Sequence, residues 1–560
     1  MTSECNIGHY ARRQIDQFYA EGLWAAENFT DVLRARAERE GDRTFVTDGT
    51  FTLSFAAVAD RSERLAVGLH RLGLRRGDRV AVQMPNWAEF VVIASALARI
   101  GAVMVPIMPI YRSDEVSHVV ADAEIRTAIA PVRFKGFDHI AMFEDIRGRG
   151  GMLESIIAVR AESQDREALL ARDIRLLDDH FVDDPDIDAD AEIGARVHPD
   201  DPFVIVYTSG TTARPKGCVH TFNTYAASAR SLQAAFGHSS SDVQFGPSPI
   251  THTTGLLTSV LLPLFSGAAT HLMAEWDPVR ALAEIRDFRC TVSVTATTFL
   301  QTLLTAADDD PNADLSSLRV WVCAGSPIPA AVVEKATTRL PTAAVLSLYG
   351  RSENLLTTTC TVDDDPRRAI TSDGSALRGI EVRIVDEEGR EVPRGRQGDI
   401  AYRGPSHMIE YLNRPAETAE LFTPDGFSRS GDLGVMDEDG FVRVTGRTKD
   451  IVIRGGMNIS VREVEDKLAA HPDLIAVAVV GMPDERLGEK VCCYVVPAPG
   501  HTAPTVEDLR AYLLERGVAV QKTPERVTVV DRLPMTATGK IQKHVLREWA
   551  AAGNPQPAAP

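Results

Sequence analysis

From Phe45 to about Leu300, short apolar runs rich in β-branched residues alternate with longer stretches of helical character. Residues 79–82 and 128–130 are examples of the short runs. Strands that are apolar on both faces are typical of parallel sheets, because helices cover both sides of such a sheet. The pattern therefore predicts an α/β fold built from helix-covered parallel sheets.

One apolar stretch, at residues 90–110, approaches the length of a membrane span. Arg99, Gly101 and Pro106 interrupt it. We interpret the stretch as a buried helix that leads into a buried strand at residues 102–106. No membrane span is expected.

The pattern changes in the second half of the chain. Residues 381–403 form short alternating segments joined by turns that contain glycine and proline, which predicts a small β-subdomain. After Lys449 the chain is expected to build a compact unit of about 100 residues. The predicted helices of this unit cover residues 461–471 and 506–516, and its predicted strands cover residues 476–480 and 491–496.

Composition narrows the class of protein. The chain has 560 residues, of which 44% are hydrophobic and 25% charged, as in an ordinary globular protein of several domains. The net charge of −18 argues against a nucleic-acid partner, since phosphate backbones select basic surfaces. The seven cysteines show no zinc-binding spacing and indicate reduced thiols, and residues 1–19 lack the apolar block of a signal peptide. We therefore expect a cytoplasmic protein.

Residues 207–217 form a loop rich in hydroxyl groups and glycine, directly after the apolar run at residues 203–206. Backbone N–H and side-chain O–H groups in such a loop converge on phosphate oxygens, and a lysine adds positive charge. The loop is not a Walker A motif, because Pro215 precedes the lysine and Gly217 follows it. Ordinary surface loops share this composition, so the prediction depends on the rest of the chain. The candidate phosphate-binding residues are Thr208, Ser209, Gly210, Thr211, Thr212 and Lys216.

Further motifs follow this loop in a fixed order. They are Tyr-Gly-Arg-Ser-Glu at 349–353, Ser-Gly-Asp-Leu at 430–433, Gly-Arg-Thr-Lys-Asp at 446–450, Gly-Gly-Met-Asn-Ile at 455–459 and Pro-Met-Thr-Ala-Thr-Gly-Lys-Ile at 534–541. Together with the loop, these motifs resemble the signatures of the adenylate-forming superfamily, which contains acyl-CoA synthetases, peptide-synthetase adenylation domains and beetle luciferases. The resemblance covers nearly the whole chain.

The resemblance implies a domain organisation. A large N-terminal domain of helix-covered sheets plus the β-subdomain would occupy residues 1–448. A small, mobile C-terminal α/β lid domain would occupy residues 449–550. Residues 551–560 contain three prolines and no charge, and we expect them to be a disordered tail.

The resemblance also implies a reaction in which a carboxylate joins the α-phosphate of ATP, so cations must screen two anions and stabilise a pentavalent phosphorus. Lys540 would reach from the lid to the carboxylate and the α-phosphate. Lys449 would be the hinge, because a charged residue stays solvated in both lid orientations. Gly455 and Gly456 would let a loop line a tunnel for the pantetheine arm of CoA. Without the resemblance, Lys540 would be an ordinary surface lysine and the glycine pair a hairpin turn.

Several residues are assigned to the nucleotide by the resemblance. Asp432 would accept hydrogen bonds from the ribose hydroxyls, and Arg447 would contact the ribose or the phosphates. Glu353 and Thr211 would hold Mg²⁺, since a hard cation prefers oxygen ligands. The remaining candidates at the nucleotide and acyl wall are Tyr349, Gly350, Arg351, Ser352, Gly325, Ser326 and Pro327.

Two positions bear on the acid. His252 lies where the family places an aromatic residue or a histidine near the carboxylate, and a histidine satisfied in the core is the alternative. Amino-acid-adenylating relatives carry an aspartate in this region, whereas residues 250–255 contain none, which favours an acid without an α-amino group. Arg351 stands at a position that is usually uncharged in relatives. It could pair with Glu353, pair with a phosphate or recognise a polar group on the acid, and it favours a cyclic or polycyclic acid over a simple fatty acid.

The leading hypothesis is an ATP-dependent acid:CoA ligase that uses ATP, Mg²⁺ and CoA. The first alternative is an adenylation-only enzyme that passes acyl-AMP to a carrier protein or a separate acyl-accepting partner. The second is an inert scaffold of the same fold. The expected substrate is a small-molecule carboxylic acid, and a homodimer is among the expected assemblies.

Overall fold

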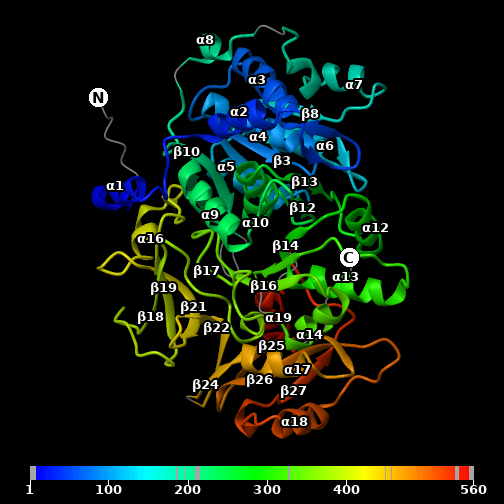
Figure 1. The fold of residues 1–560 in the computed structure, drawn as a ribbon. Coiled ribbons are helices and arrows are strands. Elements are labelled where there is room, and N and C mark those ends of the chain that lie inside the picture. Colours follow the sequence, from blue (N-terminus) through cyan, green and yellow to red (C-terminus); the bar gives the residue numbers. More distant parts are fainter. Residues whose placement is uncertain are drawn as a thin grey trace.

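The structure of the 560-residue chain is a computed structural model. It describes residues 8–184, 187–194, 196–208, 215–325, 328–447, 450–455, 457–536 and 541–553. In Figure 1 the blue to green elements form a large body, the yellow elements lie along one side of it, and the orange and red elements pack below.

Within the described residues, the first part of the chain builds two large sheets. The first has the order β17 (Thr358–Thr359), β16 (Ala344–Tyr349), β15 (Val320–Ala324), β14 (Val292–Ala296), β12 (Val243–Gly246), β13 (Ala269–Leu272), β1 (Thr44–Thr47) and β2 (Thr52–Ser54). The second has the order β20 (Glu410–Tyr411), β11 (Gly217–Thr221), β10 (Pro202–Tyr207), β4 (Val103–Ile107), β3 (Arg79–Gln83), β5 (Thr127–Pro131), β8 (Ser155–Val159) and β9 (Arg175–Leu176). The inner strands run parallel, and β2, β17, β11 and β20 add antiparallel pairs at the edges. This arrangement confirms the prediction of an α/β fold.

Helices cover both sheets and lie between them (Figure 1). One buried cluster joins Val46 of the first sheet and Val204 of the second with Ala94 and Tyr225, which come from two of the intervening helices. The main core therefore sits between the sheets. The longer helices are α2 (Phe29–Glu40), α3 (Phe55–Arg71), α4 (Ala88–Ile100), α5 (Ser113–Asp122), α6 (His139–Gly148), α9 (Phe222–Ala235), α12 (Pro278–Asp287), α13 (Thr297–Asp309) and α14 (Ala330–Arg339). Shorter elements are β6 (Arg133–Phe134), β7 (Phe137–Asp138), α7 (Arg166–Ala171), η1 (Leu177–His180), α8 (Ala189–Ile193) and α15 (Arg368–Thr371).

The apolar stretch at residues 90–110 is a helix followed by a strand, as predicted. Helix α4 is buried along nearly all of its length, which explains why it has so few polar residues. Gly101 ends the helix with φ of +80°, a conformation that glycine adopts without strain. Strand β4 begins at Val103, one residue later than predicted. Among the described residues, no helix is both long enough and apolar enough to cross a membrane.

The β-subdomain extends further along the chain than the sequence pattern indicated. It is an antiparallel sheet with the order β18 (Glu381–Val385), β19 (Gly398–Arg403), β21 (Ser428–Met436) and β22 (Val442–Arg447). The first two strands confirm the prediction for residues 381–403. The other two continue the same sheet and carry the motifs at 430–433 and 446–447.

The last part of the chain forms an α/β unit. Its sheet has the order β24 (Met457–Ser460), β23 (Ile451–Arg454), β26 (Gly488–Pro497) and β25 (Leu474–Asp484), with β27 (Arg526–Val529) parallel to β26. Its helices are α17 (Val461–Leu468), α18 (Val506–Glu515), η4 (Val520–Lys522) and α19 (Lys543–Ala551). The two predicted strands lie inside β25 and β26, and the two predicted helices end three residues and one residue earlier than expected. Helix α19 reaches one residue into the predicted tail, and residues 554–560 lie outside the described part.

This C-terminal unit contacts the β-subdomain beside its own first helix. Ser460 donates a hydrogen bond of 2.7 Å to the carbonyl of Thr445 on β22. Arg443, also on β22, lies 3.6 Å from the carboxylate of Asp466 on α17. The predicted hinge, Lys449, lies outside the described residues, so the domain boundary at 448 and 449 stays a prediction.

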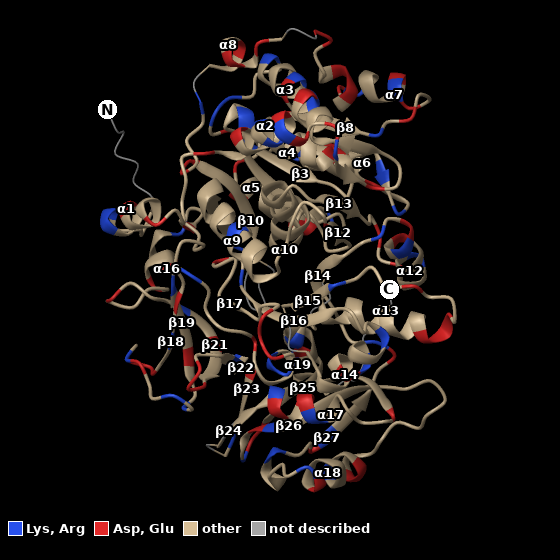
Figure 2. Ribbon diagram, viewed as in Figure 1, with Lys and Arg blue, Asp and Glu red and all other residues tan. Residues whose placement is uncertain are grey.

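An N-terminal arm, residues 8–24 with helix α1 (Arg12–Ala20), crosses the segment that leads into β20. The hydroxyl of Tyr10 lies 3.0 Å and 2.9 Å from the carbonyl oxygens of Gly404 and His407. Trp24 donates its indole N–H to the carbonyl of Pro405 at 3.0 Å. The arm therefore anchors a segment almost 400 residues away in the chain. Figure 2 shows acidic and basic residues interspersed along outer helices such as α3 and α7, whereas central elements such as β10 carry none.

Candidate active site

Glu353 is the first carboxylate of the candidate site. It follows β16 in a tight segment, in which the N–H of Arg351 donates to the carbonyl of Asn354 at 2.8 Å. Gly350 makes this segment possible, because a Cβ there would lie 2.4 Å from the carbonyl oxygen of Leu355. The carbonyl of Glu353 itself accepts a hydrogen bond of 2.8 Å from the N–H of Met408.

The side chain of Glu353 is held through a single oxygen. Arg351 donates from Nη2 to Oε1 at 3.0 Å, and Tyr411 donates its hydroxyl to the same Oε1 at 2.6 Å. No other side chain of the described residues donates a hydrogen bond to Oε2, although Glu353 is only 7% exposed, and the backbone N–H of Glu353 is a further donor to this carboxylate. Both side-chain donors therefore end on Oε1, and Oε2 has no side-chain partner among the described residues.

The attraction between Arg351 and Glu353 shifts the pKa values of both groups more than burial does. Burial alone would raise the pKa of Glu353, but the neighbouring Arg351 and the hydrogen bond from Tyr411 hold it below its usual range. Burial likewise disfavours the guanidinium charge of Arg351, but Glu353 raises the pKa of Arg351 well above its ordinary value. Both groups are charged at neutral pH.

Asp432 is the second carboxylate, and the β-subdomain positions it. Strands β21 and β22 place Asp432 directly opposite Arg447. Arg447 donates from Nε to Oδ1 at 2.9 Å, and the hydroxyl of Tyr349, at the end of β16, donates to Oδ2 at 2.6 Å. Burial and the adjacent Asp432 raise the pKa of Tyr349 well above its ordinary value, so its hydroxyl keeps the proton that it donates.

The two ends of the predicted phosphate loop lie close together. The N–H of Thr208 donates to the carbonyl of Lys216 at 2.9 Å, next to the antiparallel pair of β10 and β11. The ammonium of Lys216 forms an ion pair with Glu417 in helix α16 (Pro415–Ala419), and it lies 4.9 Å from the ring centroid of Tyr411. Tyr411 thus contacts Glu353 with its hydroxyl and Lys216 with its ring. Ser209, Gly210, Thr211 and Thr212 lie outside the described residues.

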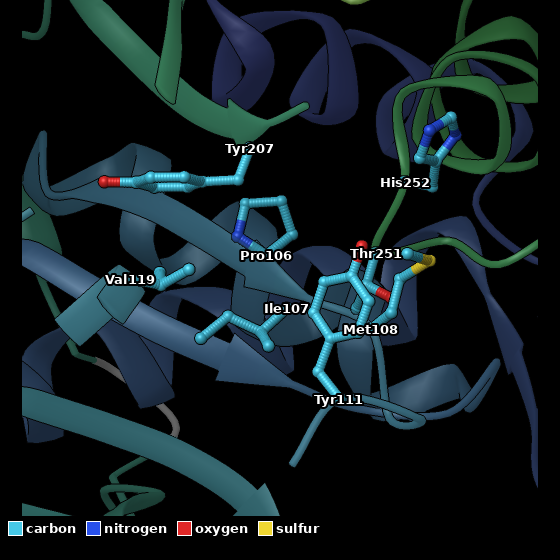
Figure 3. Close-up of a pocket in the computed structure, with 8 residues that line it drawn as sticks. All are labelled: Pro106, Ile107, Met108, Tyr111, Val119, Tyr207, Thr251 and His252. Atoms are coloured by element: carbon cyan, nitrogen blue, oxygen red, sulfur yellow. The ribbon is translucent and has the colours of Figure 1, made fainter. Parts of the chain in front are cut away.

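His252 borders a hollow of about 260 Å³, a volume that includes space open to solvent (Figure 3). Its side chain accepts a hydrogen bond of 3.4 Å from the N–H of Thr254 and caps the helical segment that starts there. That segment consists of α10 (Thr253–Gly255), a π-helical part η2 (Leu256–Leu261) and α11 (Leu262–Ser266), and π-helical turns are frequent at functional sites. The hollow is lined by Pro106, Ile107, Met108, Tyr111, Val119, Tyr207, Thr251 and His252, so it is mostly apolar.

The remaining predicted residues belong to other elements or lie outside the described residues. Gly325 directly follows β15 and has φ of +79°, and Gly455 lies in the β23–β24 hairpin with φ of +57°. Met535 and Ile541 form an antiparallel bridge on either side of the predicted catalytic segment. Ser326, Pro327, Lys449, Gly456 and Lys540 lie outside the described residues, and their roles stay predictions.

The structure therefore brings five predicted residues together, namely Tyr349, Arg351, Glu353, Asp432 and Arg447. Ser352 belongs to the same segment, and its carbonyl lies 2.7 Å from Nε2 of the buried His220. Sequence reasoning missed Tyr411, which links Glu353 to Lys216. Its place on the short strand β20, paired with β11, carries no local signal, because the contact depends on an edge pairing between distant segments.

Comparison with known proteins shows which family this chain resembles over most of its length. The model of the family described as AMP-binding enzyme matches residues 33–412, and that of the AMP-binding enzyme C-terminal domain matches residues 463–540. A medium-chain fatty-acid–CoA ligase of Escherichia coli (strain K12) is 35% identical over 94% of this chain and 91% of its own length. A 3-[(3aS,4S,7aS)-7a-methyl-1,5-dioxo-octahydro-1H-inden-4-yl]propanoyl:CoA ligase of Rhodococcus jostii (strain RHA1) is 36% identical over 92% of this chain and 97% of its own.

One further relative is named as an AMP ligase, and one similar solved structure as a CoA ligase. A 2,3-dihydroxybenzoate-AMP ligase of Bacillus subtilis (strain 168) is 31% identical over 95% of both chains. Among solved structures, the anthranilate CoA ligase AuaEII in complex with anthranoyl-AMP superposes with a TM-score of 0.84 at 26% identity, over 94% of this chain and 98% of that chain. The matched family models, the near full-length relatives and the shared fold show that this chain belongs to the AMP-binding enzymes, the adenylate-forming superfamily that its motifs resemble.

Proposed function

We propose that this adenylate-forming enzyme is an acid:CoA ligase. In the first half-reaction a carboxylate oxygen attacks the α-phosphorus of ATP, and pyrophosphate leaves. In the second, the thiol of CoA attacks the acyl carbon of acyl-AMP, and AMP leaves. The observation that carries the proposal is the cluster of Glu353 and Asp432 beside the end of β16, in which each carboxylate accepts one hydrogen bond from an arginine and one from a tyrosine.

The residues of this cluster suit MgATP. Asp432 accepts a hydrogen bond at each of its two oxygens, and each oxygen keeps a lone pair for a ribose hydroxyl. Lys216 would exchange its ion pair with Glu417 for a phosphate oxygen. Oε2 of Glu353 is an oxygen ligand of the kind that Mg²⁺ prefers, so the residues present fit the cation. Bound there, Mg²⁺ would neutralise charge on the phosphates, with Thr211 as the predicted second ligand.

Free CoA is the proposed acyl acceptor. Three of the similar proteins described above are named as CoA ligases, and the β23–β24 hairpin with Gly455 is the element proposed to line the pantetheine tunnel. The second candidate function is adenylation alone, with acyl-AMP passed to a carrier protein or another partner. The similarity to a dihydroxybenzoate-AMP ligase favours this alternative.

The proposed substrate is a carboxylic acid without an α-amino group, with a cyclic or polycyclic body. The apolar lining of the hollow at His252 and the similarity to a ligase for a bicyclic propanoic acid support this choice. Arg351 no longer supports it, because its guanidinium pairs with Glu353. A cytoplasmic location is part of the proposal, and the six buried, unpaired cysteines of the described residues are consistent with reducing surroundings.

A pyrophosphate-release screen over fatty, aromatic and polycyclic acids, with and without CoA, tests this proposal. We expect release to depend on ATP and on one class of acid, and thioester to appear only with CoA. Lys540→Ala is the control for adenylation and should lower the rate by about a few hundredfold, since one well-placed cation at a reacting phosphate contributes that much. Acyl-AMP formation without use of CoA would favour the second candidate.

The two half-reactions can also be separated. Lys449→Pro fixes φ and removes a backbone donor at the proposed hinge. Single-turnover reactions of this variant should accumulate acyl-AMP and form no thioester, whereas Lys449→Ala serves as the matched control that keeps the backbone free. If proline abolished both steps equally, the hinge assignment would be wrong.

A further inference from the structure

The contact between Arg351 and Glu353 bears on how the proposed cation binds. Arg351 is 17% exposed at its side chain and Glu353 9%, so water screens this pair only weakly. Nη1 of Arg351 is buried and has no hydrogen-bond partner among the described residues. The guanidinium is therefore held in place mainly by its single bond to Glu353 rather than by a network of its own.

Both side-chain hydrogen bonds to the carboxylate of Glu353 end on Oε1. They stop the carboxylate from rotating and from offering both oxygens to one cation. A cation at Oε2 would also lie within a few ångströms of a guanidinium that already neutralises Glu353, where like charges repel each other strongly. The site is thus a poor one for a free divalent cation.

The same arrangement attracts a cation that arrives on a nucleotide. The Mg²⁺ complex of a nucleoside triphosphate keeps a net negative charge, and Arg351, Lys216 and Arg447 provide positive charge around it. The guanidinium attracts the negatively charged complex and repels the free cation. Oε2, which no other side chain of the described residues contacts, is the oxygen that can meet the metal of the complex.

We propose that Arg351 is a positioning residue that makes Glu353 selective for the metal–nucleotide complex over the free metal, with Tyr411 fixing the carboxylate in the same orientation. This inference rests on the proposed function, in which Glu353 faces the phosphates. It goes beyond that function because it assigns Arg351 to the metal and not to the acid.

Electron paramagnetic resonance of Mn²⁺ tests the proposal without any turnover. Free Mn²⁺ is titrated into the full chain with and without a saturating amount of ATP. The parent should bind Mn²⁺ weakly alone and far more tightly with ATP. Arg351→Met, which removes the charge but keeps much of the length, should raise the affinity for Mn²⁺ alone by about tenfold or more and reduce the enhancement by ATP.

Two variants serve as matched controls. Arg351→Lys keeps the positive charge and should bind Mn²⁺ alone within about threefold of the parent, because only the planar fork is lost. Glu353→Gln in the Arg351→Met background should abolish the gained affinity, which places the metal at this carboxylate. Thermal unfolding of each variant checks that the fold is kept.

Equal Mn²⁺ affinity of the methionine and lysine variants would overturn the proposal. So would a gain in affinity that survives Glu353→Gln, because the metal would then lie elsewhere. Neither result depends on acyl-AMP formation, so the proposed function is tested separately. If Arg351→Met changed the ranking of acids while Mn²⁺ binding stayed the same, Arg351 would belong to the acid site.

Discussion

Glu353 and Asp432 have the same kinds of partner and use them differently. Each carboxylate accepts one bond from an arginine and one of 2.6 Å from a tyrosine. At Glu353 both bonds end on one oxygen, whereas at Asp432 they end on different oxygens. The arginine beside Glu353 is 17% exposed at its side chain, and the arginine beside Asp432 is 47% exposed.

This difference matches two different tasks. A carboxylate with one fixed and one free oxygen offers a single ligand atom, which suits a cation that takes its other ligands from phosphate and water. A carboxylate fixed at both oxygens presents two equivalent acceptors, which suits the paired hydroxyls of a ribose. The distribution of the partners therefore distinguishes the sites, although their composition is alike.

The largest loss of adenylation is expected from a substitution of Glu353. Glu353→Gln keeps the shape but removes the charge, so it should weaken the proposed metal site and leave Arg351 as an unpaired buried charge. Adenylation should fall by about a hundredfold to a thousandfold, as measured by acid-dependent exchange of pyrophosphate into ATP. Glu417→Gln, which removes a carboxylate from the ion pair with Lys216, is the control and should not cause a loss of this size.

Asp432→Asn should act on nucleotide recognition. Charge-assisted hydrogen bonds contribute about 1.5–3 kcal/mol each, so kcat/KM for ATP should fall by about tenfold to a hundredfold. The parent should also prefer ATP over 2′-deoxyATP, and the variant should have lost part of that preference. An unchanged preference would show that the ribose does not bind at Asp432.

The geometry of the two sites can be compared by double-mutant cycles. Tyr411→Phe and Arg351→Met remove two bonds from the same oxygen, so their effects on adenylation should be strongly non-additive. Tyr349→Phe and Arg447→Met remove bonds from different oxygens of Asp432, so their effects on adenylation should be closer to additive. Each tyrosine variant alone should cost about tenfold, which is typical of groups that orient a ligand residue. Equal coupling energies in both cycles would show that the partners of Glu353 and Asp432 do not act differently.

The smallest effect is expected from the N-terminal arm, because its Tyr10 acts on the Glu353 site only through the segment before β20. Tyr10→Phe removes the hydroxyl that contacts the segment before β20 and so loosens Tyr411. We expect a loss of about threefold in adenylation, since a neutral hydrogen bond contributes only about 1 kcal/mol. ATP discrimination at Asp432 should not change. A change there would mean that the arm acts on the fold as a whole.

Much of the fold followed from local patterns. The alternation of apolar runs predicted the parallel sheets, and Gly101 marked the end of α4 where left-handed backbone is needed. The extent of the β-subdomain was underestimated, because many residues of β21 and β22 are only half-buried and their motifs resemble turns. Strand ends shifted by a few residues where sheet pairing, and not propensity, sets the boundary.

The candidate site was less accessible to sequence reasoning. Glu353 and Asp432 could be named because their motifs resemble a known family. The partner of Arg351 could not be named, since a carboxylate, a phosphate and the acid were all within reach of a long side chain. Tyr411 could not be found at all, because it meets Glu353 only through tertiary packing across 58 residues.

Single-turnover chemistry with α-labelled ATP tests the central claim most directly. The enzyme is mixed with an acid selected by the pyrophosphate screen, and the products are separated before and after CoA is added. The account predicts labelled acyl-AMP before CoA, and its conversion to acyl-CoA with stoichiometric labelled AMP afterwards. Labelled ADP in the first phase, or acyl-AMP that persists in the presence of CoA, would contradict the account.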